Sequence, residues 1–244
     1  MMKANVTRAA RSCIAAMIVA AGLSGCAGLA GPRPGERVAD APKLAVGARW
    51  VYRARDGFRA PDLWTETREI TAMGAGGYTV SIEQRGPAID VDRQETWRAP
   101  GLVSVGALMD AETRRFAVPL ERYRFPLYAG EIWNQWIDNY NETTRKPGQI
   151  NRYVRVSGWE KVATPAGTFD AIRMRVLMHL DDGDAWRWPT QCNYVIWYAP
   201  AVGAAVREEK DAEYYEKGDG RDGASVVRTQ HSVLELVAWS PGTP

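Results

Sequence analysis

Polar and apolar residues alternate along several segments of the 244-residue chain, and this pattern constrains the possible folds more than any other feature. In the clearest segment, every second residue is apolar: Ile172, Met174, Val176, Met178 and Leu180. Residues 78–85 and 49–55 alternate in the same way. Because successive side chains of a strand point to opposite faces, such alternation indicates half-buried antiparallel strands. The sequence therefore predicts an all-β protein.

Turn-forming residues separate the alternating segments. Glycines crowd residues 74–77, and Pro165 and Gly167 suit a turn at 164–167. Asp-Gly pairs at 182–183, 219–220 and 222–223 are typical of hairpin tips. Residues 107–116 are the one candidate for a short helix.

Three landmarks occur in the same order in both halves of the chain, which indicates an internal duplication. The matched pairs are 44–50 with 127–133, 75–78 with 166–169, and 97–102 with 197–202. The first pair shares Leu, Gly and Trp, and the third begins with Trp-x-Ala-Pro. We therefore expect two β repeats, 44–124 and 125–240, forming curved sheets or half-barrels that share one core.

The N-terminus has the three parts of a lipoprotein signal peptide in the expected order. Basic residues come first, an apolar stretch of 11 residues (13–23) follows, and Leu23-Ser24-Gly25-Cys26 resembles the bacterial lipobox. The prediction is that residues 1–25 are removed and that Cys26 carries acyl chains, which anchor the protein to a membrane. An ordinary signal peptide cut elsewhere is the alternative. The Pro- and Gly-rich residues 26–43 are expected to form a flexible tether.

Charge and cysteine content narrow the function further. Ala27, rather than Asp, follows Cys26, and the sorting rule of enteric bacteria then favours an outer-membrane anchor facing the periplasm. Three of the 31 basic residues lie in the signal, so 28 basic and 29 acidic residues remain, with a net charge of −1. This charge argues against a nucleic-acid partner. Cys192 is the only cysteine left besides Cys26, so no intramolecular disulfide is expected.

The second half carries a sharper motif string, best seen in Thr164–Ala171 and in Trp197–Gly203. It resembles uncharacterised bacterial envelope domains, many secreted or lipid-anchored, that share a TPAGTF…WYAP.VG signature. The resemblance covers about residues 125–210. It implies an antiparallel β fold and no established activity, cofactor or catalytic residue. The motif residues themselves have structural explanations, such as the turn at Pro165 and Gly167.

Candidate catalytic and metal-binding residues are sparse. Cys192 with His179 or His231 is the one thiol-nucleophile option, against a small buried thiol. Asp181-Asp182-Gly183-Asp184 has carboxylates for a hard cation but lacks a full calcium-loop pattern, and a polar hairpin tip explains it better. No phosphate-binding loop, serine elbow or zinc-ligand spacing occurs. We therefore expect no metal site and no cofactor.

Aromatic residues outside the duplicated landmarks are the best candidates for contact with a ligand or partner. Trp186, Arg187 and Trp188 follow the acidic tip, and Trp64 is expected in another loop. They would hold a glycan, a partner protein or the membrane interface. The alternative is that these loops fold back and cap an open end of the sheets.

The sequence favours a non-catalytic envelope module that binds an apolar ligand or another envelope protein. The alternatives are an envelope hydrolase with carboxylate acid–base chemistry and a structural assembly factor. A hollow interior lined by Ile172, Met174, Val176 and Met178 would favour a lipid carrier. A cleft with converging carboxylates of raised pKa would favour the hydrolase.

Overall fold

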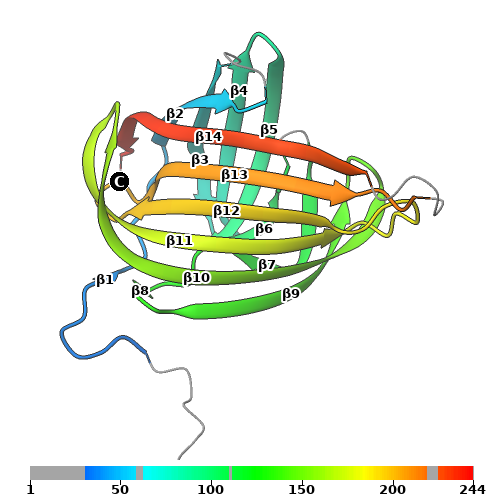
Figure 1. Ribbon diagram of the computed structural model, residues 1–244. Helices are drawn as coiled ribbons and strands as arrows, with labels where there is room; N and C mark the ends of the chain where they lie inside the picture. Colours follow the sequence, from blue (N-terminus) through cyan, green and yellow to red (C-terminus); the bar gives the residue numbers. More distant parts are fainter. Residues whose placement is uncertain (1–30, 59–62, 110–111, 219–224, 244) are drawn as a thin grey trace, which may run out of the picture. The chain divides into compact units, whose positions relative to one another are not determined.

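A computed structural model describes residues 31–58, 63–109, 112–218 and 225–243, and these residues fold as antiparallel strands without an α-helix (Figure 1). The strands are β1 (Val38–Ala39), β2 (Ala48–Asp56), β3 (Leu63–Gly74), β4 (Gly77–Gly86), β5 (Ile89–Ala99), β6 (Leu102–Gly106), β7 (Arg114–Glu121), β8 (Leu127–Tyr128), β9 (Ile132–Asn141), β10 (Lys146–Thr164), β11 (Gly167–Asp181), β12 (Thr190–Ala199), β13 (Ala204–Tyr215) and β14 (Val226–Pro241). The prediction of an all-β, antiparallel fold is confirmed. Within the described ranges, no helix has the length and apolarity to cross a membrane.

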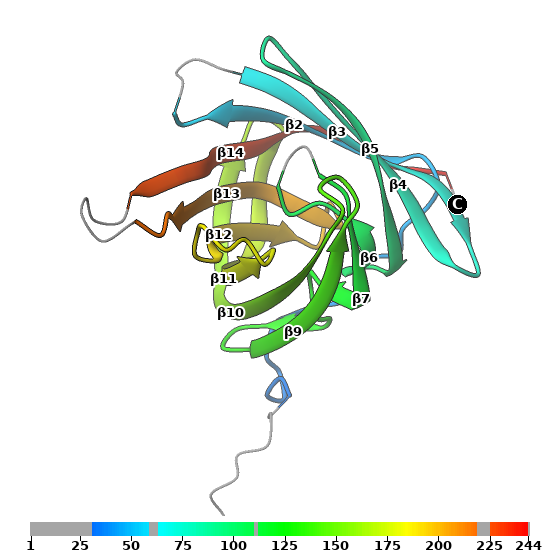
Figure 2. The same cartoon turned by 90° about the vertical axis from the view of Figure 1, so that its right-hand side faces the viewer.

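Twelve of these strands form one closed barrel. Its order is β10-β11-β12-β13-β14-β2-β3-β4-β5-β6-β7-β9, and β9 pairs with β10 to close it. Strands β4 and β5 run across the direction of β10–β13, so the barrel has two differently oriented walls (Figures 1 and 2). The short strands β1 and β8 pair with each other outside the barrel order.

The alternating segments form the strands that they predict. In β11, the apolar positions from Ile172 to Leu180 are buried, and the polar positions between them face outward. The turn at Pro165 and Ala166 joins β10 to β11, and Gly167 adopts a φ of 133°, which favours glycine. Gly77 opens β4 with a φ of 107°, and a Cβ there would lie 1.9 Å from the carbonyl oxygen of Trp97.

Three local expectations are wrong. The described residues of the range 107–116 form no helix: β6 ends at Gly106 and β7 begins at Arg114, because both segments join the barrel ladder. The Asp182-Gly183 pair is no tight hairpin tip, since residues 182–189 form a longer loop between β11 and β12. Trp64 lies in β3 rather than in a loop, where it pairs with Ala54 and is half-buried. The Asp-Gly pairs at 219–220 and 222–223 lie outside the described residues.

The barrel interior is filled by two clusters of buried apolar side chains. One contains Ile172, Met174, Val176 and Met178, each at most 2% exposed. The other gathers β2, β4 and β14 around residues such as Tyr52. The four residues expected to line a hollow carrier cavity therefore pack within a core. Small cavities of about 30 and 70 Å³ remain between side chains of the described residues.

Part of the segment 26–43, which was expected to form a flexible tether, belongs to the folded unit. Residues 31–35 form a separate, exposed unit, and the folded unit begins at Glu36. Val38 and Ala39 pair with Tyr128 and Leu127, which gives this part of the expected tether a fixed place. Cys26 and the signal segment 1–25 lie outside the described residues.

The matched landmarks of the two halves have similar backbone conformations. Gly47 and Gly130 have φ values of 82° and 85°, and each precedes a strand that carries a buried tryptophan. Trp50 Nε1 donates to the carbonyl of Val202 at 2.9 Å, whereas Trp133 Nε1 has no hydrogen-bond partner among the described residues. The duplication itself stays a prediction.

Candidate functional site

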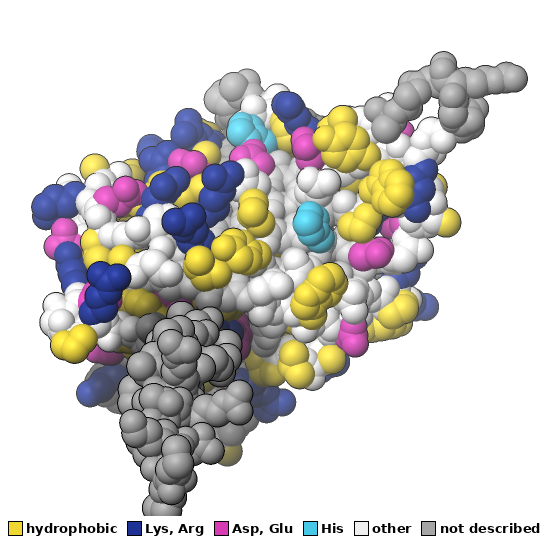
Figure 3. All heavy atoms as spheres, turned by 60° about the horizontal axis from the view of Figure 1, so that its bottom comes forward, with side chains coloured by type: hydrophobic (Ala, Val, Ile, Leu, Met, Phe, Trp, Pro, Cys, Tyr) yellow, Lys and Arg dark blue, Asp and Glu magenta, His cyan; other side chains and the backbone are white. Residues whose placement is uncertain are grey.

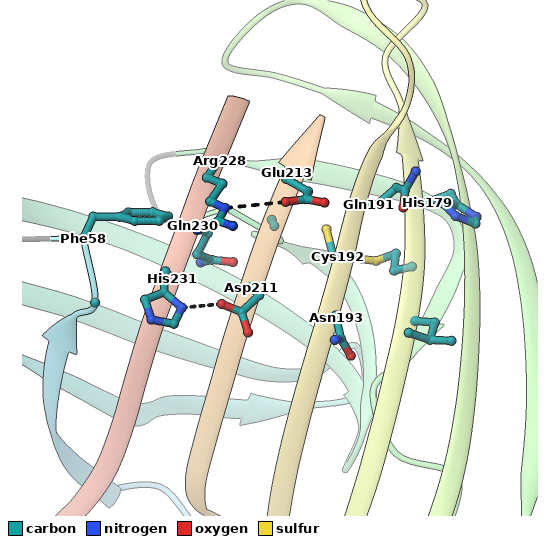
Figure 4. A pocket seen from close by; sticks show the side chains of 14 residues that line it. Phe58, His179, Gln191, Cys192, Asn193, Asp211, Glu213, Arg228, Gln230 and His231 are labelled. Atoms are coloured by element: carbon teal, nitrogen blue, oxygen red, sulfur yellow. Dashed lines mark hydrogen bonds and ion pairs between the residues drawn. The ribbon is translucent and has the colours of Figure 1, made fainter. Parts of the chain in front are cut away.

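A groove of about 680 Å³ lies on the outside of the barrel, across four neighbouring strands (Figure 4). We call it the outer-face groove. The residues that line it from the outer side of the barrel are Gly57, Phe58, Leu177, His179, Gln191, Asn193, Asp211, Glu213, Arg228 and His231. Along the same strands, Met178, Cys192 and Ala212 are buried, so the groove lies on the outer face. Both histidines of the chain line the groove. The face of the molecule drawn in Figure 3 shows the two histidine side chains, in cyan, among hydrophobic and charged side chains.

Strand register arranges the polar walls in two parallel rows. One row runs through His179, Gln191, Glu213 and Arg228, each paired with the next across β11–β14. The second row runs through Leu177, Asn193, Asp211 and His231. Directly opposite Cβ atoms on paired strands are about 5 Å apart, so each row presents closely spaced polar groups on a rigid surface.

Local contacts fix the β14 end of the groove. His231 Nδ1 and Asp211 Oδ1 form a hydrogen bond, and the Phe58 ring lies 5.4 Å from the imidazole. Gly57 donates its backbone N–H to the carbonyl of His231 at 2.6 Å. A Cβ at Gly57 would lie 1.7 Å from His231 Cδ2, so this position has no room for a side chain.

The groove presents both hydrogen-bond donors and acceptors. Gln191 and Asn193 contribute amides, which combine both functions in one group. Arg228 Nε lies 3.8 Å from Glu213 Oε2, and Arg175 Nε donates a hydrogen bond to Asn193 Oδ1 at 3.3 Å. Phe58, 45% exposed, and Leu177, 43% exposed, add apolar surface.

The thiol of Cys192 is unsuited to nucleophilic attack in this groove. Cys192 lies on β12, next to the strand of His179 and two strands from that of His231, but its side chain is 3% exposed and belongs to the core. Burial raises the pKa of the thiol to about 12. A neutral, buried thiol is a poor nucleophile, so the Cys–His option has no support in this geometry.

Carboxylates converge inside the barrel, but their pKa values shift in the direction opposite to that expected of a general acid. Burial alone would raise the pKa of Glu95, yet Arg122 and Arg93 outweigh burial and lower it to about 2. The pKa of Glu208 is likewise lowered, because Arg68 and Lys210 outweigh its burial. These carboxylates are ion-pair partners and stay ionised.

One carboxyl group has a raised pKa and lies elsewhere. Burial raises the pKa of Glu131 to about 7, and its Oε2 has no hydrogen-bond partner. Glu131 lies in the turn between β8 and β9 and lines neither the groove nor the two interior cavities. It therefore offers no acid–base partner at the candidate site.

The loop of residues 182–189 folds onto the end of β13. Trp186 packs edge-on against Tyr214 at 5.5 Å, and the ammonium of Lys217 lies 4.8 Å from the Trp188 ring. Both tryptophans stay more than half exposed, at 53% and 55%. Arg187 differs from them: it is largely buried, pairs with Asp184 at 2.8 Å and hydrogen-bonds to Thr190 at 2.7 Å.

The remaining predicted residues have structural partners. Asp182 pairs with Arg114 at 2.6 Å, and Asp184 pairs with Lys146 at 2.5 Å. Two carboxylates of the acidic segment 181–184 are therefore neutralised by cationic side chains of the protein. No group of metal-ligating side chains occurs among the described residues. Trp64 packs against the core cluster that contains Tyr52, and its Nε1 has no hydrogen-bond partner among the described residues.

The sequence singled out His179 and His231 only as possible partners of Cys192 and did not identify the other groove residues. Gln191, Asn193 and Asp211 appear in the sequence only as the polar positions of alternating strands. Their proximity depends on the register of three strand pairs, which alternation does not supply.

Comparisons with known proteins indicate the fold alone. No known protein family and no curated protein matches the chain. A protein of Bacteroides fragilis, described as exported and as having a YmcC-like fold, is 13% identical over 83% of this chain and 99% of that one, with a TM-score of 0.52. A protein of Parabacteroides distasonis, described as a lipoprotein, is 13% identical over 84% of this chain and all of that one, with a TM-score of 0.47. The first likeness shows a shared architecture.

Proposed function

We propose that the chain is a lipid-anchored protein of the cell envelope that binds a glycan in the outer-face groove without chemical conversion. The lipobox ending at Cys26 supports the anchor. The description of the Bacteroides fragilis protein as exported agrees with an envelope location. The anchor would hold the groove close to a membrane surface, with the periplasmic face of the outer membrane as the proposed place.

The observation that carries the binding proposal is the pair of polar rows across β11–β14. A sugar ring presents hydroxyl groups that both donate and accept hydrogen bonds, and a site for it needs both functions in close spacing. Gln191, Asn193 and His231 provide them on one rigid sheet. Phe58 supplies an exposed aromatic face beside them for the apolar face of a sugar.

The structure favours this ligand over an apolar one. The expected carrier residues Met174 and Val176 are buried in a packed core. The large groove is instead lined mostly by polar side chains. An apolar ligand there would exclude water from the Gln191 amide and from the Asn193 amide nitrogen without offering them hydrogen bonds, which costs binding free energy.

Calorimetric titration with soluble peptidoglycan fragments tests the proposal. Binding to the native protein is expected, and the double variant Gln191→Ala/Asn193→Ala should weaken it about tenfold or more, since it removes at least two hydrogen bonds. The matched control is Ser81→Ala/Gln94→Ala, a paired Ser and Gln on the distant strands β4 and β5. It should bind like the native protein.

Two outcomes would overturn the proposal. One is the absence of binding to peptidoglycan fragments and to lipopolysaccharide core oligosaccharide alike. The other is binding that both double variants weaken equally, which would place the ligand away from the groove. Hydrolysis of the fragments, followed by mass spectrometry, would contradict the non-catalytic part.

A further inference from the structure

One group of charged side chains inside the barrel contains more cations than carboxylates. We call these residues the interior charge cluster: Arg68, Arg93, Arg122, Arg152 and Lys210, with Glu66, Glu95 and Glu208. Five cations and three carboxylates leave an excess of two positive charges. Uncompensated charge is costly inside a protein, so this excess calls for an explanation.

Four of the cations have carboxylate partners. Arg68 donates to Glu66 at 2.6 Å and to Glu208 at 2.7 Å. Lys210 lies 3.0 Å from Glu208. Glu95 is shared between Arg122, at 2.9 Å, and Arg93, at 3.4 Å. The three carboxylates are thus already used by these four cations.

Arg152 is the cation that has no carboxylate partner among the described residues. Its guanidinium donates to the backbone carbonyls of Glu121, at 2.6 Å, and Arg122, at 3.2 Å. The residue is 4% exposed. Burial and the nearby charge of Arg122 lower the pKa of Arg152 to about 10, and the guanidinium is still charged at neutral pH. A buried guanidinium with two carbonyl contacts keeps unused N–H donors.

Arg152 lines an interior cavity together with Glu95 and Glu208 of the same cluster. The cavity has a volume of about 70 Å³, and Arg152, Arg122, Arg68, Arg93 and Lys210 all line it. One water molecule needs roughly 10–15 Å³ of such space, so a polyatomic ion has room. The Nε of Arg93 is also buried without a hydrogen-bond partner.

We propose that this cavity binds a phosphate group, with Arg152 and Arg122 as its main contacts. A phosphate monoester carries about −1.5 to −2 charges at neutral pH, which matches the excess of two positive charges. Guanidinium groups bind phosphate oxygens through paired N–H donors. The site is separate from the outer-face groove and does not depend on the glycan proposal. Free phosphate and a lipid phosphate headgroup share this chemistry.

Titration of the detergent-solubilised full-length lipoprotein in phosphate-free buffer tests the site. The probes are inorganic phosphate and the water-soluble lipid dihexanoyl phosphatidic acid. Saturable binding of one or both is expected, with a rise in the unfolding temperature as the site fills. Tighter binding of phosphatidic acid would assign the site to a lipid headgroup, and tighter or equal binding of inorganic phosphate would assign it to the free ion.

Substitutions locate the binding. Arg152→Met should weaken it by about tenfold or more, because it removes charged hydrogen bonds while keeping an apolar side chain in the core. The matched control is Arg155→Met, which lies on the same strand but faces outward and is exposed. If Arg152→Met fails to fold, Lys210→Gln serves instead, since the Lys210 side chain is 18% exposed and less central to packing. Absence of binding to both probes would overturn the proposal, as would equal binding by the folded Arg152→Met or Lys210→Gln variant and the control.

Discussion

The guanidinium of Arg122 donates from Nη2 to both carboxylate oxygens of Glu95, at 3.1 and 2.9 Å. Glu95 lies in β5 and is 2% exposed, and Arg122 directly follows β7. The pair therefore joins two parts of the barrel wall through a buried, charged contact. Trp97 Nε1 adds a third hydrogen bond to this carboxylate, at 2.8 Å.

Acid should weaken the fold through Glu95. Its pKa is about 2 in the folded protein and 4.5 in its ordinary state, because Arg122 and Arg93 outweigh burial. A lowered folded pKa stabilises the protein above pH 4.5, and this contribution is lost as the pH falls toward 2. The loss is at most about 3 kcal/mol in the free energy of unfolding. Urea unfolding at pH 6, 4 and 2.5 measures it. Glu95→Gln should flatten the dependence, whereas the exposed Glu83→Gln should leave it unchanged; an equal slope in all three proteins would refute the assignment.

Removal of Glu208 should destabilise the barrel strongly. Glu208→Ala removes the carboxylate that pairs with Lys210, and it leaves Arg68 with Glu66 as its remaining ion-pair partner. Breaking a buried ion pair costs about 3–5 kcal/mol, because one charge stays buried without compensation. The neighbouring Glu209→Ala, which breaks the more exposed pair with Arg207, should cost under about 1 kcal/mol. Urea denaturation in phosphate-free buffer compares them, and similar costs would contradict the burial argument.

Cys192 should resist thiol reagents in the native protein. Its side chain is 3% exposed, and burial raises the pKa of the thiol to about 12. In a Cys26→Ala variant, a chromogenic disulfide reagent should label the mature chain slowly until denaturant is added. Rapid stoichiometric labelling without denaturant would show that the thiol is accessible.

Lipid attachment should depend on Cys26 and not on Cys13. Cys26→Ala should abolish acylation and release the protein from membranes, since no acyl chains remain to anchor it. Cys13→Ala changes the other cysteine of the N-terminal segment and should leave acylation intact. Radiolabelled palmitate incorporation and membrane fractionation measure both. Membrane retention of an unacylated Cys26→Ala protein would disprove the anchor.

The sequence predicted where strands occur better than it predicted which residues of different strands lie side by side. Alternation from Ile172 to Leu180 identified β11 because burial of one face imposes a period of two. It did not identify the contact between Asp211 and His231, since cross-strand pairing depends on register over 20 residues. Trp64 was misplaced because Pro61 and Asp62 suggest a loop, although an aromatic residue also favours a strand.

The interior charges were the other feature that sequence could not supply. In the sequence, Arg68 and Arg152 are indistinguishable from the polar residues that alternate along any half-buried strand. Barrel closure turns their side chains inward, so only the folded chain reveals the buried cluster. The role of Arg187 was equally hidden in the sequence. Its ion pair with Asp184 holds Arg187 within the loop 182–189, while Trp186 and Trp188 on either side stay exposed.

The glycan-binding claim has a direct reporter in the chain itself. His179 and His231 are the only histidines, and both line the outer-face groove. We would record the imidazole nitrogen signals of the ¹⁵N-histidine-labelled protein during titration with soluble peptidoglycan fragments. If the glycan binds in the groove, both signals should shift and saturate together at the affinity measured by calorimetry. Calorimetric binding that leaves both histidine signals unchanged would contradict it.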